Sequence, residues 1–261
     1  MRSSLLFIFH LLLLPLYSHA QQERVYCAVK TPVNHLYFDR LNRIYAVNNT
    51  GLFQYDLECR QINSFTQRIT GGITSVDVSN PLKILVFSRA EQTIYLLNDQ
   101  LHVQSTIVLS DLGILLATLV CNSRNDGFRV FDQATQKLFR FDYSLNRIQE
   151  NDLRAALNDS FEPVMMAENE KIIAISNRGS GILVLDRFGN YMQSYSAENA
   201  DHFYLTDSEI VFTKDDKLVY LSPDKFNTII SEQIDNHQQT AIKLNNRWIY
   251  YDSTGFSVSE K

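Results

Sequence analysis

Residues 181–196 read GILVLDRFGNYMQSYS, and this stretch decides the fold. An apolar run ends at Asp186, a turn signal follows at Gly189-Asn190, and a more mixed run begins at Tyr191. Two such runs joined by a short glycine-containing turn are typical of a β-hairpin. The same phrase returns in altered form along the chain, so the hairpin is one unit of a repeat.

The repeat has a nearly constant period. Its paired apolar runs begin 38 to 44 residues apart, at Arg43, Lys83, Gly127, Lys171, Glu209 and Arg247. Most units show one more short strand before the pair, such as HLYFD at 35–39, and another after it, such as YMQSYS at 191–196. Four short strands in a unit of this length indicate a repeated antiparallel sheet.

The middle strands of the units are apolar on both faces. The runs ILVF at 84–87, IIAI at 172–175 and WIYY at 248–251 do not alternate with polar residues. A sheet with one solvent-exposed face would alternate, so each of these sheets must be covered on both sides. Four-stranded sheets packed face to face around an axis make a β-propeller. A β-sandwich, the alternative, gives no reason for the repeat.

The two ends of the chain predict how the ring closes. The last unit, from Ala241 onward, has only three strands, whereas RVYCAV at 24–29 belongs to no unit. Placing the N-terminal strand at the outer edge of the last sheet completes it and removes two open edges. The sequence therefore predicts an all-β fold, a single propeller of six four-stranded blades over residues 21–261.

The repeat also resembles a known family. The phrases DRLNRIYAVNNTGLFQYD at 39–56 and LDRFGNYMQSYS at 185–196 look like the repeats of NHL-type and related six-bladed β-propellers. WD-repeat and sialidase signatures do not occur in the chain. With its N-terminal segment the chain is also similar to small exported bacterial propellers of the cell envelope. The resemblance implies a fold and a scaffold role, and it transfers no catalytic residue.

The N-terminus predicts export. Residues 1–20 read MRSSLLFIFHLLLLPLYSHA, with a basic start, a short apolar run and small residues before Gln21. This pattern is typical of a cleaved signal peptide, and the apolar run is shorter than the roughly 20 residues of a membrane-spanning helix. No later segment predicts a transmembrane span. The net charge of −5 and the lack of a Lys/Arg run argue against nucleic acid as a partner.

The candidate chemical groups are few. His35, His202 and His237 fall in or near links between blades, where they could share one rim, but no pair has metal-ligand spacing. Inner-strand Asp77 and Asp207 could face the axis. The carboxylates that end third strands are predicted to form turns, and these are Asp56, Asp99, Asp142 and Asp186. We predict no catalytic residue, no bound metal and no cofactor.

The predicted function is a non-catalytic, exported module that binds a protein partner, as an accessory subunit of a cell-envelope or outer-membrane-associated complex. The candidate partner-binding residues are the turn cations Arg89, Arg178 and Lys214 and the aromatic residues Tyr37, Phe203 and Tyr204. Cys27 and Cys59 fall on neighbouring blades and could form a disulfide across the seam. The alternatives are a metal-dependent propeller hydrolase of lactonase or glycan-active type, and a sensor of small ligands or glycans.

Overall fold

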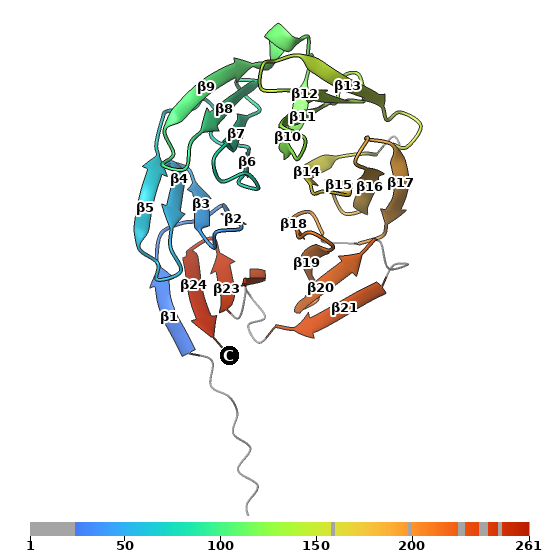
Figure 1. Cartoon of the computed structure of the whole chain (residues 1–261). Coiled ribbons are helices and arrows are strands. Elements are labelled where there is room, and N and C mark those ends of the chain that lie inside the picture. Colours follow the sequence, from blue (N-terminus) through green and yellow to red (C-terminus); the bar gives the residue numbers. More distant parts are fainter. Residues whose placement is uncertain are drawn as a thin grey trace, which may run out of the picture.

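The protein is a ring of six blades around a central axis (Figure 1). The computed structural model describes residues 24–157, 160–197, 200–223, 228–234, 240–244 and 247–260, so the predicted signal peptide lies outside the described residues. Each blade is a four-stranded antiparallel sheet, and the strands run in sequence order from the axis outward in the first five. The predicted single six-bladed β-propeller is confirmed.

The blades share one plan: a short inner strand, two buried middle strands and an exposed outer strand. Blades 1 and 2 comprise β2 (His35–Phe38), β3 (Ile44–Asn48), β4 (Gly51–Tyr55) and β5 (Gln61–Phe65), then β6 (Ser75–Asp77), β7 (Ile84–Ser88), β8 (Thr93–Leu97) and β9 (Val103–Val108). Blades 3 and 4 comprise β10 (Ala117–Ser123), β11 (Gly127–Asp132), β12 (Lys137–Phe141) and β13 (Arg147–Asp152), then β14 (Pro163–Glu168), β15 (Ile172–Asn177), β16 (Gly181–Asp186) and β17 (Tyr191–Tyr195). Blades 5 and 6 comprise β18 (Tyr204–Leu205), β19 (Ile210–Lys214), β20 (Lys217–Ser222) and β21 (Thr228–Gln233), then β22 (Thr240–Leu244), β23 (Arg247–Asp252), β24 (Gly255–Glu260) and β1 (Arg24–Val29).

The N-terminal strand closes the ring as the sequence predicts. β1 pairs antiparallel with β24 and is the outer strand of blade 6, next to the C-terminal end of the chain. A disulfide joins Cys27 of β1 to Cys59, which lies in the turn between β4 and β5 of blade 1, with 5.9 Å between their Cα atoms. Pairing and cross-link together tie the first and last blades of the ring.

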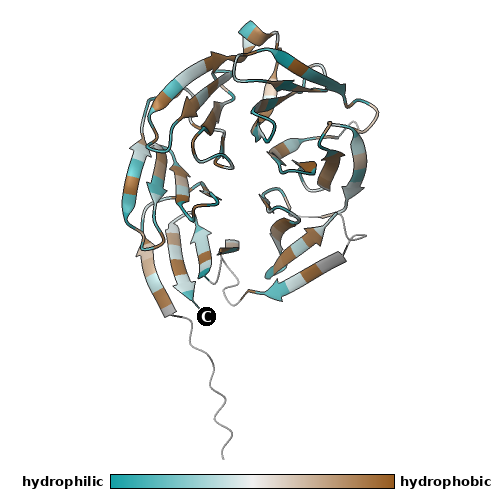
Figure 2. Cartoon of the chain, viewed as in Figure 1, coloured by the Kyte–Doolittle hydropathy of each residue, from teal (hydrophilic) through white to brown (hydrophobic). Residues whose placement is uncertain are grey.

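The hydrophobic core lies between neighbouring blades. Every residue of β7, β8 and β15 is buried, as expected for strands that are apolar on both faces. Phe87 of blade 2 and Phe128 of blade 3, for example, belong to one buried cluster. The hydropathy colouring shows the same plan, with brown middle strands and mixed outer strands (Figure 2). A 3-10 helix covers Leu109–Leu112, and no helix in the described residues has the length and hydropathy of a membrane span.

The turns between third and fourth strands use one repeated hydrogen-bond pattern. The Asp186 carboxylate accepts the backbone N–H groups of Phe188 at 2.8 Å and Asn190 at 2.9 Å. Asp56 and Asp142 occupy the same place in blades 1 and 3. These carboxylates shape turns, as the sequence predicts.

The prediction for Asp99 is wrong in blade 2. β8 ends at Leu97, so Asn98 is the residue that follows the strand, and its side-chain oxygen accepts the N–H groups of Gln100 and His102. Asn and Asp side chains each present a carbonyl or carboxylate oxygen that can accept hydrogen bonds from a turn. Here the strand ends at Leu97, one residue earlier than expected from Asp99, so Asn98 takes this role.

Candidate binding site along the axis

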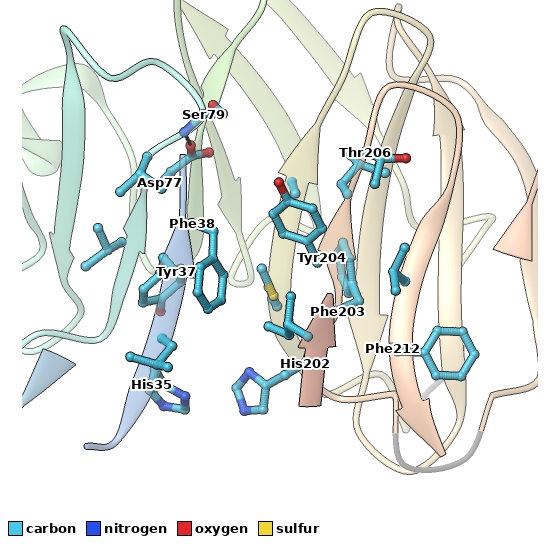
Figure 3. A pocket seen from close by; sticks show the side chains of 18 of the residues that line it. His35, Tyr37, Phe38, Asp77, Ser79, His202, Phe203, Tyr204, Thr206 and Phe212 are labelled. Atoms are coloured by element: carbon cyan, nitrogen blue, oxygen red, sulfur yellow. Dashed lines mark hydrogen bonds between the residues drawn. The ribbon is translucent and has the colours of Figure 1, made fainter. Parts of the chain in front are cut away.

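A cavity of about 380 Å³ runs along the axis of the ring. Its wall comes mainly from the inner strands β2, β6, β14, β18 and β22, and it extends between blades 5 and 6 as far as Val211 and Leu218. Figure 3 shows two polar ends separated by an apolar middle. A volume of this size, with apolar walls and a few polar groups, is that of a small-molecule site.

Two histidines stand at one end of the cavity. His35 begins β2 and His202 precedes β18, and their ring centroids are 4.6 Å apart with the planes tilted by 45° (Figure 3). We call this face of the ring the loop face, because it carries the links between blades and the turns between second and third strands. His237 lies outside the described residues.

Burial keeps both imidazoles neutral. Burial, together with the charge of the neighbouring His202, lowers the pKa of His35 to about 4. Burial and the charge of Arg178 also lower the pKa of His202, against the opposing charge of Asp201. Tyr37 is a further neighbour, 6.5 Å from the His35 ring. At neutral pH this mouth of the cavity therefore carries two uncharged rings that can each donate and accept a hydrogen bond.

The opposite end of the cavity, on what we call the turn face, holds carboxylates that are already bonded. Asp77 accepts the backbone N–H groups of Ser79 at 2.8 Å and Asn122 at 2.9 Å, so it ties blade 2 to blade 3. Glu168 is buried and forms an ion pair with the equally buried Arg129 at 2.5 Å. These bonds make both groups structural members of the wall, although both line the cavity.

The predicted aromatic residues all lie along this cavity. Tyr37 and Tyr204 line it and are half-buried, while Phe203 also packs in the core cluster of blades 4 and 5 and is only 6% exposed. The Tyr204 ring stands edge-on to Phe38, with the centroids 6.4 Å apart. Burial raises the pKa of both tyrosines, so their hydroxyls stay protonated. The structure brings these three residues together in one wall.

The predicted cations lie on the loop face, in turns between second and third strands. Arg178, in the turn between β15 and β16, is 61% exposed and lies 3.4 Å from Glu162 and 3.5 Å from Asp201. Arg89, in the turn between β7 and β8, donates to the carbonyl of Thr118 in the next blade at 2.8 Å. Burial and the positive charge of Arg178 lower the pKa of Arg89, so the two guanidinium groups interact electrostatically.

Lys214 completes this face. It ends β19 and precedes the tight turn at Asp215 and Asp216, both of which have positive φ values, of 46° and 58°. Two such residues in a two-residue loop are the pattern of a type I′ hairpin. The three predicted cations thus come from blades 2, 4 and 5 but share one face of the ring.

No group of three His, Cys, Asp or Glu side chains within the described ranges is arranged to hold a metal ion. Inner-strand Asp207 lines the turn-face end of the cavity, as predicted, and so does Asp77. The oxygens of Asp77 are engaged by N–H groups, and they are therefore not arranged as open ligands.

No protein-family profile and no curated protein matches the sequence of this chain. Solved structures resemble it in shape. The WD40 domain of Pan2 from Neurospora crassa has a TM-score of 0.64 at 9% identity, covering 91% of this chain and 95% of its own. A streptogramin B lyase has a TM-score of 0.62 at 9% identity, covering 92% and 97%. BamB from Moraxella catarrhalis has a TM-score of 0.54 at 9% identity, covering 92% and 100%.

One of these neighbours is named as a lyase, whereas the titles of the other two name no enzymatic activity. The likeness therefore does not decide whether this chain is an enzyme. At such identities the likeness establishes the fold alone. It agrees with the ring of six sheets and with the NHL-type cadence of the repeats. The chain is a six-bladed β-propeller.

Proposed function

We propose that the protein is a non-catalytic binding module of the cell envelope, exported after cleavage near Ala20, and that it docks a protein partner on its loop face. The observation that carries the proposal is that Arg89, Arg178 and Lys214, from three different blades, lie on one face of the ring. Loops and turns on a rigid scaffold are where binding residues usually lie. An accessory role in a membrane-associated complex fits this design.

Two features support the location. The N-terminal pattern at 1–20 is that of a signal peptide. The Cys27–Cys59 disulfide is the kind of cross-link that persists in oxidising compartments outside the cytosol.

The exposed Arg178 makes an acidic partner surface the expected complement. Its two carboxylate neighbours lie at 3.4 and 3.5 Å, at the long end of ion-pair distances, and exposed pairs of this kind contribute at most about 1 kcal/mol. A partner carboxylate can therefore compete for the guanidinium at little cost. Docked charge pairs of this type mainly govern association rate and its salt dependence.

The experiment is cross-linking in the native envelope followed by affinity purification of the tagged protein. Arg178→Glu reverses the charge at the loop face, while Arg187→Glu reverses an exposed cation of the same blade at the other end of β16. We expect a partner to be recovered with the natural protein and with Arg187→Glu, and to be lost with Arg178→Glu. Recovery of the monomer alone, or equal recovery with both variants, contradicts the proposal.

A further inference from the structure

Two arginines at the turn-face end of the axial cavity lack an acceptor. Arg40 lies in the turn after β2 of blade 1 and Arg124 in the turn after β10 of blade 3, and both line the cavity. Neither guanidinium group forms an ion pair or a hydrogen bond with any residue that the structure describes, whereas Arg43, in the same turn as Arg40, pairs with Asp39 at 2.6 Å. A guanidinium group without a carboxylate or carbonyl beside it is free to bind an anion.

Arg124 gives the clearer sign of a missing partner. Its Nε is buried and has no hydrogen-bond partner among the described residues. Arg43, Arg129 and Arg140 also contain a buried nitrogen without a partner, but each of these guanidinium groups is bonded through another nitrogen. Buried polar atoms normally have a partner, so an acceptor is missing beside Arg124.

Arg40, Ser79 and Arg124 lie on one arc of the ring. They come from the turns between first and second strands of blades 1, 2 and 3, which are consecutive in the ring (Figure 1). Figure 3 shows Ser79 at the turn-face end, across the cavity from Thr206 of blade 5. The Ser79 hydroxyl can donate a hydrogen bond, so an anion on this arc meets donors from three blades and stays apart from Asp207 of blade 5.

The carboxylates at this end limit the charge that the cavity accepts. Glu168 pairs with Arg129, so these two charges cancel. Asp77 is bonded to backbone N–H groups, Asp207 is exposed, and together they balance the two free arginines in charge. A head group with one negative charge gains direct contacts to the guanidinium groups, whereas a doubly charged phosphate would meet more repulsion from the same two carboxylates.

The wall further along the axis is apolar. The apolar side chains that line it and are only half-buried come from β14, β18 and β22, and they are Met165, Ala167, Leu205 and Ile242. Because these side chains are not enclosed by the cores between blades, they can contact a ligand. A hydrocarbon in this section would be held by burial of apolar surface and by dispersion.

We propose that the axial cavity binds a small carboxylic acid, as its anion, with a compact apolar body. The carboxylate lies between Arg40 and Arg124 at the turn-face end, with the Ser79 hydroxyl as a further donor, and supplies the missing acceptor for Nε of Arg124. The apolar body extends along Ala167 toward the middle of the cavity. The site is separate from the docking of a protein at Arg178 on the loop face, and either can exist without the other.

The test is a calorimetric titration of the full chain without its signal peptide. The probe is 3-phenylpropionate, and 3-phenylpropan-1-ol is the same molecule with an uncharged CH₂OH group in place of the carboxylate. We expect saturable binding of the acid, and binding of the alcohol that is at least about tenfold weaker, because charge-assisted hydrogen bonds to arginine are lost. Acetate, which lacks the apolar body, and phenyl phosphate, which carries more charge, should also bind at least about tenfold more weakly than the acid.

Three variants locate the two parts of the site. Arg124→Gln should weaken the acid about tenfold and leave the alcohol unchanged, because the alcohol does not use the charge. Arg187→Gln removes an exposed cation from the turn between β16 and β17 on the same face, and as the matched control it should keep full binding. Ala167→Leu, which adds bulk to the apolar wall, should weaken acid and alcohol alike in a protein whose unchanged Tm shows that it is folded.

Several results would each overturn the proposal. One is the absence of saturable binding of 3-phenylpropionate at millimolar concentration. Others are an alcohol, acetate or phosphate ester that binds as tightly as the acid, equal affinity of Arg124→Gln and Arg187→Gln for the acid, or full binding by Ala167→Leu.

Discussion

Breaking the Cys27–Cys59 disulfide should cost a large part of the stability of the ring. The two cysteines are 32 residues apart in the chain, and the loop-entropy expression for a closed loop of this length gives about 3.7 kcal/mol at 25 °C. The total free energy of unfolding of a folded protein is typically about 5–15 kcal/mol. The double variant Cys27→Ala/Cys59→Ala is therefore expected to unfold at a clearly lower urea concentration.

The chain contains its own reporter for this measurement. Trp248 is the single tryptophan, lies on β23 of blade 6 and is 1% exposed, so its fluorescence follows the blade that the disulfide holds. Reductant should lower the urea midpoint of the natural protein to that of the double variant. The same reductant should leave the double variant unchanged, which serves as the internal control.

Thiol titration decides whether the reasoning holds. The denatured but unreduced protein should show one free thiol, that of Cys121, which is buried and unpaired in the fold. Three titrating thiols, or a natural protein whose urea midpoint ignores reductant, would refute it.

Three further predictions concern the turns, the histidine mouth and metals. Gly181→Ala should lower the free energy of unfolding in urea by about 3 kcal/mol, because φ is 131° and an added Cβ would lie 1.9 Å from the Tyr195 carbonyl oxygen. Gly179→Ala is the matched control: φ is 62° and no atom lies within 4 Å of the added Cβ, so the loss should be only about 1 kcal/mol. His35 takes up its proton near pH 6.5 when unfolded but only near pH 4 when folded, so its contribution to stability is complete above pH 6.5 and is lost as the pH falls toward 4. Urea midpoints measured across that window should fall less steeply for His35→Gln, and identical slopes would contradict the assignment. Adding Ca²⁺ or Zn²⁺ should leave Tm unchanged, because the oxygens of Asp77 already accept N–H groups and are not open metal ligands. A metal that binds stoichiometrically and raises Tm would instead support the hydrolase alternative.

The architecture could be predicted because its signals are local and repeated. The period, the double-sided apolar runs and the spare strand at 24–29 each follow from the residues nearby, and the structure confirms them. Asp99 shows where local signals fail. It lies two residues beyond the end of β8 at Leu97, and the sequence alone does not reveal that Asn98, directly after the strand, accepts the hydrogen bonds of the turn.

The site was harder to predict because its members come from distant blades. The ring contact of His35 and His202 joins residues far apart in the chain, and no spacing rule connects them. A signal does exist: HLYF at 35–38 and HFYL at 202–205 place His and Tyr alike, and Tyr37 and Tyr204 both pair with the second residue of the next strand.

The buried ion pair was also missed. Arg129 interrupts the apolar run FRVF at 128–131, and a lone charge on a strand covered on both sides requires a buried partner. Its partner, Glu168, belongs to the next blade, so the pair becomes visible only when blades 3 and 4 are packed together.

Site-specific photo-cross-linking in the envelope tests most directly whether the loop face is the docking surface. A benzophenone side chain placed at Lys214 probes the loop face, and one placed at Phe188, which is 55% exposed in the turn between β16 and β17, probes the turn face. We predict a cross-linked species of higher mass from position 214 and none from position 188. Adducts from position 188 alone, or from neither position, would contradict the account.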